Sequence, residues 1–196
     1  MPTNSAVPAQ PDALSLIADL SVVLDRWGRW YLFGAQAVVM YGVPRLSADV
    51  DVTVRLDPDD PERFARAMCD AGFSLRIDDP EFVRRTRVIP FVHRRTGMPL
   101  DVVLAGSGLE DEFIERANLV DAGSVRVPVI DPEDLVIAKV LAGRSKDVDD
   151  AATLWRLRGA TLNADRIRRV LSMVEEAIGQ SDLVPRFESI RRGHGD

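Results

Sequence analysis

Two aspartates stand two residues apart in a stretch that alternates between polar and apolar residues. Residues 45–55 place Asp49 and Asp51 on the polar face of an expected strand, with apolar residues on the other face. Successive strand side chains point to opposite sides, so both carboxylates are expected to project together and to repel each other. Mg²⁺, which prefers oxygen ligands, relieves such repulsion. Asp101, which begins the expected strand Leu100–Leu104, is a third candidate, and three such carboxylates could hold one or two Mg²⁺ ions.

A short apolar run upstream delivers the chain to a glycine. Trp30–Phe33 is expected as a buried strand and Ala35–Tyr41 as a short helix, with Gly34 between them. Free backbone N–H groups and the positive end of the helix dipole would then face an anion beside Gly34, and phosphate is the obvious candidate. Gly34 and Asp49 are only fifteen residues apart, so the sequence predicts a phosphate cradle next to the metal site.

The chain contains 25 basic residues, of which only Lys139 and Lys146 are lysines, and both fall in one short window. This skew indicates that a compact ammonium group is needed there instead of a guanidinium fork. Lys139 is the only charged residue in the apolar run Leu135–Ala142. Its aliphatic stem is therefore expected to be partly covered while its ammonium group reaches a site.

Taken together, these residues resemble the nucleotidyltransferase superfamily, with its Gly-Ser or Gly-Gly turn, its strand with two aspartates and its third strand carboxylate. The stretch 34–51 looks most like the minimal branch that includes AbiEii/MenT-type toxins, whose Arg-x-Ser/Thr-x-Asp-x-Asp string matches residues 45–51. That branch also carries a later lysine and a Lys-Asp-x-x-Asp element, matched by Lys139 and residues 146–150. The resemblance spans about residues 32–154. It departs at Ala35, where the superfamily often has a serine hydroxyl.

The resemblance implies a Mg²⁺-dependent enzyme that transfers an NMP from an NTP such as ATP to a hydroxyl acceptor and releases pyrophosphate. Asp49 and Asp51 would bind the metal, and Asp101 would complete the metal site and help to deprotonate the acceptor. Lys139 is the fourth residue with an implied catalytic role. The implied nucleotide-binding residues are Gly34, Ala35, Arg45, Ser47, Lys146, Asp147 and Asp150. The resemblance further implies a toxin that modifies the 3′ end of tRNA and has a cognate antitoxin protein as partner.

Other interpretations of these residues stay open. Residues 45–55 could form an edge strand with a solvated face, in which Asp49 pairs with Arg45 or Asp51 pairs with Arg55. Asp101 could be a turn residue. Lys139 could be a surface lysine, and the polar residues at 146–150 could simply be helix-start chemistry.

The function also has alternatives. The acceptor could be a small hydroxylated molecule, as for antibiotic-modifying members of the superfamily, and a net charge of −6 fits that better than tRNA. The fold could instead serve as a non-catalytic nucleotide-binding or partner-binding module, which Ala35 makes credible. Arginine clusters at 84–87, 94–95, 166–169 and 191–192 could be solvated faces or could guide a phosphate-rich acceptor.

The order of the expected elements predicts an α+β fold. A mixed β-sheet flanked by helices is expected over residues 12–130, and a C-terminal helical lobe over 131–192. Residues 1–11 are expected to be a disordered leader and 193–196 a tail. The single Cys69 excludes an intramolecular disulfide, and no apolar run is long enough for a bilayer, so a cytoplasmic protein is expected.

Overall fold

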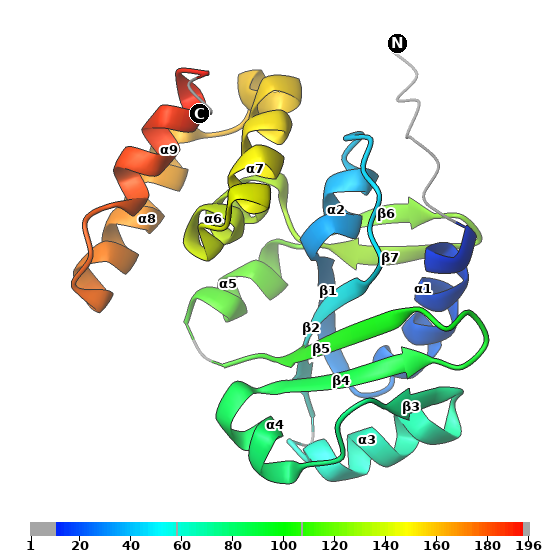
Figure 1. The fold of residues 1–196 in the computed structure, drawn as a ribbon. Helices are drawn as coiled ribbons and strands as arrows, with labels where there is room; N and C mark the ends of the chain where they lie inside the picture. Colours follow the sequence, from blue (N-terminus) through cyan, green and yellow to red (C-terminus); the bar gives the residue numbers. More distant parts are fainter. Residues whose placement is uncertain (1–10, 58, 107, 194–196) are drawn as a thin grey trace. The chain divides into compact units, whose positions relative to one another are not determined.

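The computed structural model describes residues 11–57, 59–106 and 108–193 (Figure 1). The chain divides into two compact units, with the boundary between Ile130 and Asp131. The expected leader lies, apart from Pro11, outside the described residues, and so do residues 194–196 of the expected tail.

The first unit combines helices with one mixed sheet. Within the described residues, seven strands form this sheet in the order β3-β4-β5-β2-β1-β7-β6. The β2–β5 and β1–β7 pairs are parallel and the other pairs are antiparallel. The strands are β1 (Gly28–Phe33), β2 (Val50–Leu56), β3 (Phe73–Leu75), β4 (Val88–His93), β5 (Pro99–Leu104), β6 (Asn118–Ala122) and β7 (Val125–Val129). The helices are α1 (Pro11–Leu24), α2 (Gly34–Met40), α3 (Pro61–Asp70), α4 (Pro80–Thr86) and α5 (Leu109–Arg116).

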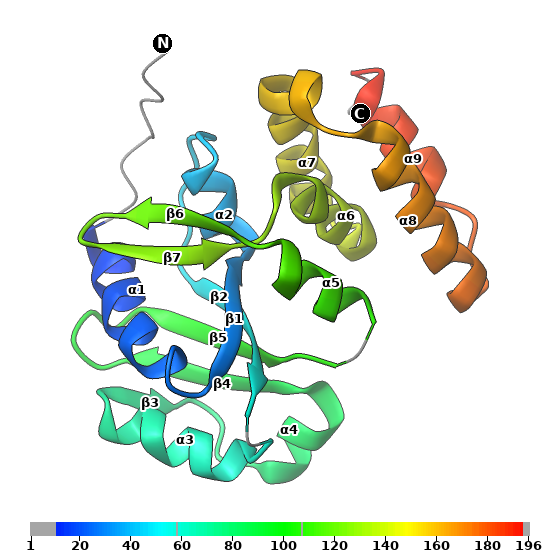
Figure 2. The same ribbon diagram turned by 180° about the vertical axis from the view of Figure 1, so that it is seen from behind.

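One face of the sheet forms the core of this unit. Val50, Val52 and Val54 of β2 are fully buried, as are Leu100 and Val102 of β5, which lie beside them in register. Helix α1 packs against this unit's sheet, as Figure 2 shows from behind, and α3 packs beside β3. The opposite face carries Asp51, Thr53 and Arg55 of β2, of which Thr53 is buried and the other two are half-buried. The alternation in the sequence therefore sorts apolar side chains to the core and the Asp51 carboxylate to the opposite face.

Strand β2 is shorter than the sequence predicts, and the expected strand at 45–55 is corrected. It begins at Val50, and residues 43–49 are irregular. Its neighbours explain the start, because β1 ends at Phe33 opposite Asp51 and β5 offers its first partner, Leu100, at Val50. Strand β1 offers no partner beyond Phe33, and on the other side only Pro99, which has no N–H to donate, precedes Leu100 in β5, so the residues before Val50 leave the sheet.

The structure contains four elements that the sequence does not predict, namely β3, α4, α5 and β6. Each is short, and α4 contains no buried residue that would give it a strong apolar period. The hairpin expected through Thr96 and Gly97 is present as the antiparallel β4–β5 pair. The mixed sheet with flanking helices confirms the α+β class.

The second unit is helical. It contains α6 (Pro132–Ala142), α7 (Ser145–Arg158), the 3₁₀ turn Gly159–Thr161, α8 (Ala164–Ile178) and α9 (Leu183–Arg191). Helix α6 packs against α7 and α8, and α9 also packs against both of those helices. Leu135, Leu154, Leu171 and Phe187, one from each helix, are fully buried, so these helices share one apolar core.

Candidate functional site

Two of the three predicted carboxylates occupy neighbouring places in the sheet. Asp51 of β2 lies directly beside Asp101 of β5 in the parallel register, and paired residues of parallel strands present their side chains on the same face. Asp49 immediately precedes β2 and is two residues from Asp51. All three aspartates are half-buried. We call Asp49, Asp51 and Asp101 the acidic row.

Gly34 lies in close contact with the carboxylate of Asp51. It begins α2 with a φ of +67°, a conformation that L residues with a side chain rarely adopt. A Cβ atom placed on Gly34 would lie 2.1 Å from Oδ2 of Asp51, so only glycine lets this carboxylate approach the turn. No side chain caps the start of α2, and all its residues, including Ala35, are buried. Glycine thus brings the backbone of the turn next to the acidic row, as the sequence predicts.

Two side chains contact Asp49: Ser47, which is a predicted site residue, and Gln36, which is not. The Ser47 hydroxyl lies 2.8 Å from Oδ1 of Asp49 and 3.0 Å from its carbonyl oxygen. Gln36 of α2 is 2% exposed, and its Nε2 donates to the same carbonyl oxygen over 3.4 Å. Ser47 therefore orients a carboxylate in this structure, whereas the resemblance implies that it contacts the nucleotide. Gln36 was missed, although it is the only polar side chain of the apolar helix α2.

Asp101 has a cationic partner that the sequence does not reveal. The Arg76 guanidinium forms an ion pair with Oδ1 of Asp101, and both side chains are a little over one third exposed. Arg76 follows β3 and donates its backbone N–H to Pro90, which is the β4 partner of Asp101. Arg76, Asp101 and Asp51 consequently line up across four strands. This alignment depends entirely on the strand order of the sheet.

The expected set of three metal ligands is not assembled in this arrangement. Over residues 11–57, 59–106 and 108–193, no group of three His, Cys, Asp or Glu side chains is gathered closely enough to hold a metal ion. One oxygen of Asp101 is instead paired with Arg76. Mg²⁺ is usually bound through one or two carboxylates, with substrate phosphates and waters as its other ligands. Asp49 and Asp51 could supply these carboxylates. The role of the acidic row as metal ligands stays a prediction.

The edge-strand interpretation of residues 45–55 is wrong. Strand β2 lies fourth in the sheet, between β5 and β1. Arg55 is not the ion-pair partner expected for Asp51, since its guanidinium contacts the carbonyl oxygen of Gly106 and the carboxylate of Asp111 on α5. Arg45 precedes β2 in the irregular segment and is half-buried. Asp51 therefore lies on an inner strand of the sheet, and Asp49 lies just before that strand.

The predicted lysine and the later acidic element come together within the second unit. Lys139 of α6 is 7% exposed, and its Nζ lies 2.8 Å from Oδ1 of Asp147 and 2.8 Å from Oδ2 of Asp150. Arg144 contacts the other oxygen of Asp147. Burial raises the pKa of Asp147, but hydrogen bonds from Arg144 and Lys139 outweigh burial and lower this pKa below its usual range.

This buried cluster decides between two interpretations of Lys139. A surface lysine is excluded by its burial, and the side chain instead links α6 to α7 through two carboxylates. Lys146, in contrast, is exposed. Whether any of these residues binds a nucleotide stays a prediction.

Several arginines of the basic clusters are engaged within the protein. Arg84 pairs with Glu81, and Arg87 donates to the carbonyl oxygens of Leu104 and Ala105. In the second unit, Arg168 pairs with Glu188 and Asp165. These contacts favour the interpretation of the clusters as structural or solvated faces.

Comparison with solved structures identifies the class of fold. ANT(2″)-Ia, solved in complex with adenylyl-2″-tobramycin, superposes with a TM-score of 0.56 at 14% identity, covering 85% of this chain and 98% of that one. An antigenic nucleotidyltransferase-like protein from Paracoccidioides brasiliensis gives 0.53 at 14% identity, covering 95% of each chain. JHP933 from Helicobacter pylori gives 0.50 at 12% identity, covering 94% and 90%. The fold is therefore that of the nucleotidyltransferases.

The sequence itself places the chain more narrowly. Residues 14–158 match the family described as "Nucleotidyltransferase of unknown function (DUF6036)", and the chain belongs to this family. Comparison with curated proteins finds no match. The predicted AbiEii/MenT-type branch is not among these findings and stays a prediction. In the part of the chain that the structure describes, no helix is both long and apolar enough to cross a membrane.

Proposed function

We propose that this protein is a Mg²⁺-dependent nucleotidyltransferase that moves an NMP from an NTP to a hydroxyl acceptor. The observation that carries the proposal is the register of Asp51 beside Asp101, with Gly34 directly beneath Asp51. A backbone turn next to neighbouring carboxylates would suit a triphosphate that binds together with metal ions. The family match supports the reaction class.

The acidic row would hold the metal with Asp49 and Asp51 as first ligands. Ser47 orients the carboxylate of Asp49, and Gln36 holds its main-chain carbonyl, so this carboxylate is already positioned before a ligand arrives. When bound, Mg²⁺ neutralises negative charge on the triphosphate oxygens and on the leaving pyrophosphate. Asp101 would join the ligand set once Arg76 yields its carboxylate oxygen.

The chain's own contribution to the transfer is mainly positioning. The acceptor hydroxyl oxygen forms a bond to the α-phosphorus, and the bond from that phosphorus to the β-bridging oxygen breaks to release pyrophosphate. The hydroxyl proton needs a base, and Asp101 is the candidate carboxylate. Backbone N–H groups at Gly34 and Ala35 would face the phosphates, and Arg45 would help to neutralise them. Positioning of this kind makes loss of one carboxylate more harmful than loss of an exposed arginine.

Two acceptor classes fit this chemistry, and the charge distribution favours the smaller one. The net charge is −6, and Arg84, Arg87 and Arg168 already contact carboxylate or carbonyl oxygens of the protein, which favours an acceptor that is not a polyanion. ANT(2″)-Ia is described with an adenylylated tobramycin, a small hydroxylated molecule. The proposed acceptor is therefore a small hydroxylated compound, with the 3′ end of tRNA as the second candidate from the AbiEii/MenT-like residues.

An acceptor assay tests the proposal. The protein is incubated with Mg²⁺ and each α-labelled NTP, either with total cellular RNA or with a set of small aminated and hydroxylated compounds. Label in the small-molecule fraction supports the proposed acceptor, and label in RNA supports the toxin interpretation, in which induction of the protein should arrest growth unless an antitoxin is present. No label in either fraction, with intact binding of NTP, would support the non-catalytic binding module.

A further inference from the structure

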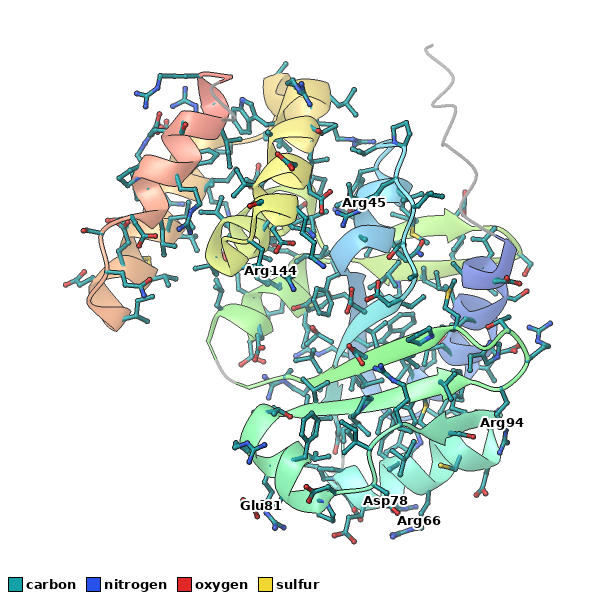
Figure 3. The ribbon with its side chains drawn as sticks, in the orientation of Figure 1. Arg45, Arg66, Asp78, Glu81, Arg94 and Arg144 are labelled. Atoms are coloured by element: carbon teal, nitrogen blue, oxygen red, sulfur yellow. The ribbon has the colours of Figure 1, made fainter. Side chains whose placement is uncertain are left out.

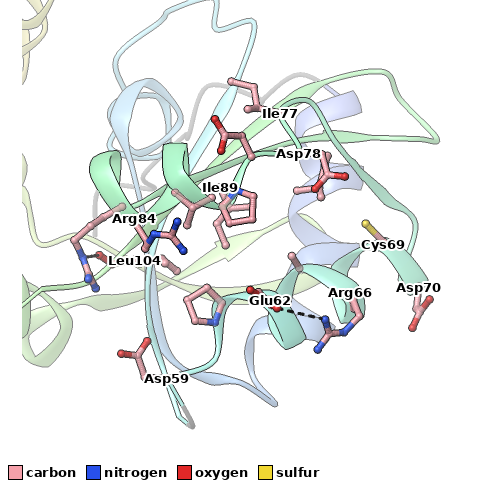
Figure 4. Close-up of a pocket in the computed structure, with 17 residues that line it drawn as sticks. Asp59, Glu62, Arg66, Cys69, Asp70, Ile77, Asp78, Arg84, Ile89 and Leu104 are labelled. Atoms are coloured by element: carbon pink, nitrogen blue, oxygen red, sulfur yellow. Dashed lines mark hydrogen bonds and ion pairs between the residues drawn. The ribbon is translucent and has the colours of Figure 1, made fainter.

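A cavity lies at the β3 edge of the sheet, away from the acidic row. It is formed by α3, α4, β3 and β4 and has a volume of about 720 Å³ (Figure 4). This volume falls within the range of about 300–1,000 Å³ that is usual for small-molecule sites. Leu75, Ile77 and Ile89 give the cavity an apolar lining, and Ile77 is 38% exposed. The cavity can therefore take the apolar body of a ligand.

The cavity and the acidic row lie on opposite faces of the same sheet. Leu75 is paired with Phe91, and both present their side chains to the core face. Arg76, the next residue, reaches across the other face to Asp101. Leu75 and Ile77 line the cavity, while Arg76 between them forms the ion pair with Asp101. A ligand of the cavity is thus distinct from the nucleotide.

The rim of the cavity carries excess negative charge. Five acidic side chains and three arginines line it, and the arginines already have partners. Arg84 pairs with Glu81, Arg66 lies 3.9 Å from Glu62, and Arg87 donates to main-chain carbonyl oxygens.

Three of the acids, in contrast, have no such compensation. Within the described ranges 11–57, 59–106 and 108–193, the side chains of Asp59, Asp70 and Asp78 make no hydrogen bond or ion pair. Asp78 and Arg66 lie at the α3–α4 end of the first unit (Figure 3). An anion such as a nucleotide would be repelled from this rim, whereas a cation would be attracted.

We propose that this cavity binds a small organic cation, in which an amine, amidine or guanidine group is attached to an apolar body. The apolar body would contact Leu75, Ile77 and Ile89, and the cationic group would lie at the acidic rim beside Asp78. An inorganic cation fits this cavity poorly, because the apolar lining offers it no ligands. A fatty acid or a phosphate ester fits poorly because the acidic rim repels its negative charge. This site does not depend on the proposed nucleotidyl transfer.

A matched set of three probes tests the charge requirement. Benzamidine, benzamide and benzoate have similar shapes and carry a positive charge, no charge and a negative charge. Isothermal titration of the full-length protein should give benzamidine an affinity about fivefold or more above that of benzamide, and no measurable binding of benzoate. The Asp78→Asn variant should reduce this preference about two- to fivefold, since it removes one exposed charge of the rim. Asp121→Asn, which removes an exposed acid on β6, is the charge-matched control and should leave the preference unchanged.

Cys69 locates the bound probe. It is the only cysteine of the chain, it is half-buried, and it lines the cavity from α3. Bound benzamidine should slow its alkylation by neutral iodoacetamide, and benzoate should not. The proposal is overturned if benzamidine and benzamide bind equally well, if millimolar benzamidine does not bind, or if it binds without protecting Cys69. Loss of NTP turnover in a separate assay would leave these outcomes unaffected.

Discussion

Replacement of Gly34 by alanine probes the contact on which the candidate site depends. The new Cβ would lie 2.1 Å from Oδ2 of Asp51, whereas ordinary van der Waals contact begins near 3.4 Å. The carboxylate or the turn must therefore move by about 1.3 Å. Misplacement of a reacting group by about 1 Å can cost on the order of 100-fold in rate, and we expect a loss of this size in NMP transfer.

The backbone strain of this substitution has its own control. Gly97, in the turn between β4 and β5, has a φ of +71°, close to the +67° of Gly34, and a Cβ there would meet nothing within 4 Å. Alanine at either position should cost about 1–2 kcal/mol of folding free energy, because both residues are left-handed. Only Gly34→Ala adds the collision with Asp51.

Steady-state turnover and urea unfolding of both variants separate these effects. Gly97→Ala should lose stability and keep its activity when assayed well below its unfolding midpoint. Gly34→Ala should lose at least as much stability together with most of its activity. If Gly34→Ala transfers NMP within about threefold of Gly97→Ala, the close approach of Asp51 to the turn has no catalytic importance, and our reasoning about the site fails.

Three further predictions concern the buried lysine, acid stability and the metal. Lys139→Ala leaves two carboxylates buried without their ammonium partner and should cost about 3–5 kcal/mol in urea unfolding, while Lys146→Ala, at an exposed position, should change stability by less than about 0.5 kcal/mol; similar losses would contradict the account. Because the pKa of Asp147 is lowered in the folded protein, its carboxylate stabilises the helical unit at every pH above the usual pKa of an aspartate. This stabilisation should be lost as the pH falls through the lowered pKa. Acid titration followed by circular dichroism should show no such loss in the Asp147→Asn variant. Arg76→Gln should bind Mn²⁺ more tightly than the native protein without nucleotide, as measured by electron paramagnetic resonance, because Asp101 loses its competing cation; unchanged affinity would show that Arg76 does not compete.

Local signals in the sequence predicted many elements well. Asp60 followed by Pro61, and Asp131 followed by Pro132, indicate helix starts, and in the structure both aspartates cap the helices α3 and α6. The signals of these helix starts lie within one turn of the chain, so they can be recognised without knowledge of distant contacts. The prediction of α6 is correct at both ends, since Gly143 closes it in a left-handed conformation.

Register and strand order could not be predicted from such local signals. The alternation at 45–55 predicted a strand but not its start at Val50, which is set by where β1 and β5 end. Three aspartates indicated a carboxylate site, but their neighbours come from other strands. Arg76 reaches Asp101 only because β3 follows β4 and β5 in the sheet, and no feature of residues 73–77 shows this.

The most direct test of the central claim is a comparison of label transfer from α-labelled and γ-labelled NTP in the presence of Mg²⁺. We predict that the acceptor gains the α-label and not the γ-label. Asp51→Asn should abolish this transfer, and the exposed control Asp121→Asn should retain it. Transfer of the γ-label, or undiminished transfer by Asp51→Asn, would contradict the assignment of the acidic row to nucleotidyl transfer.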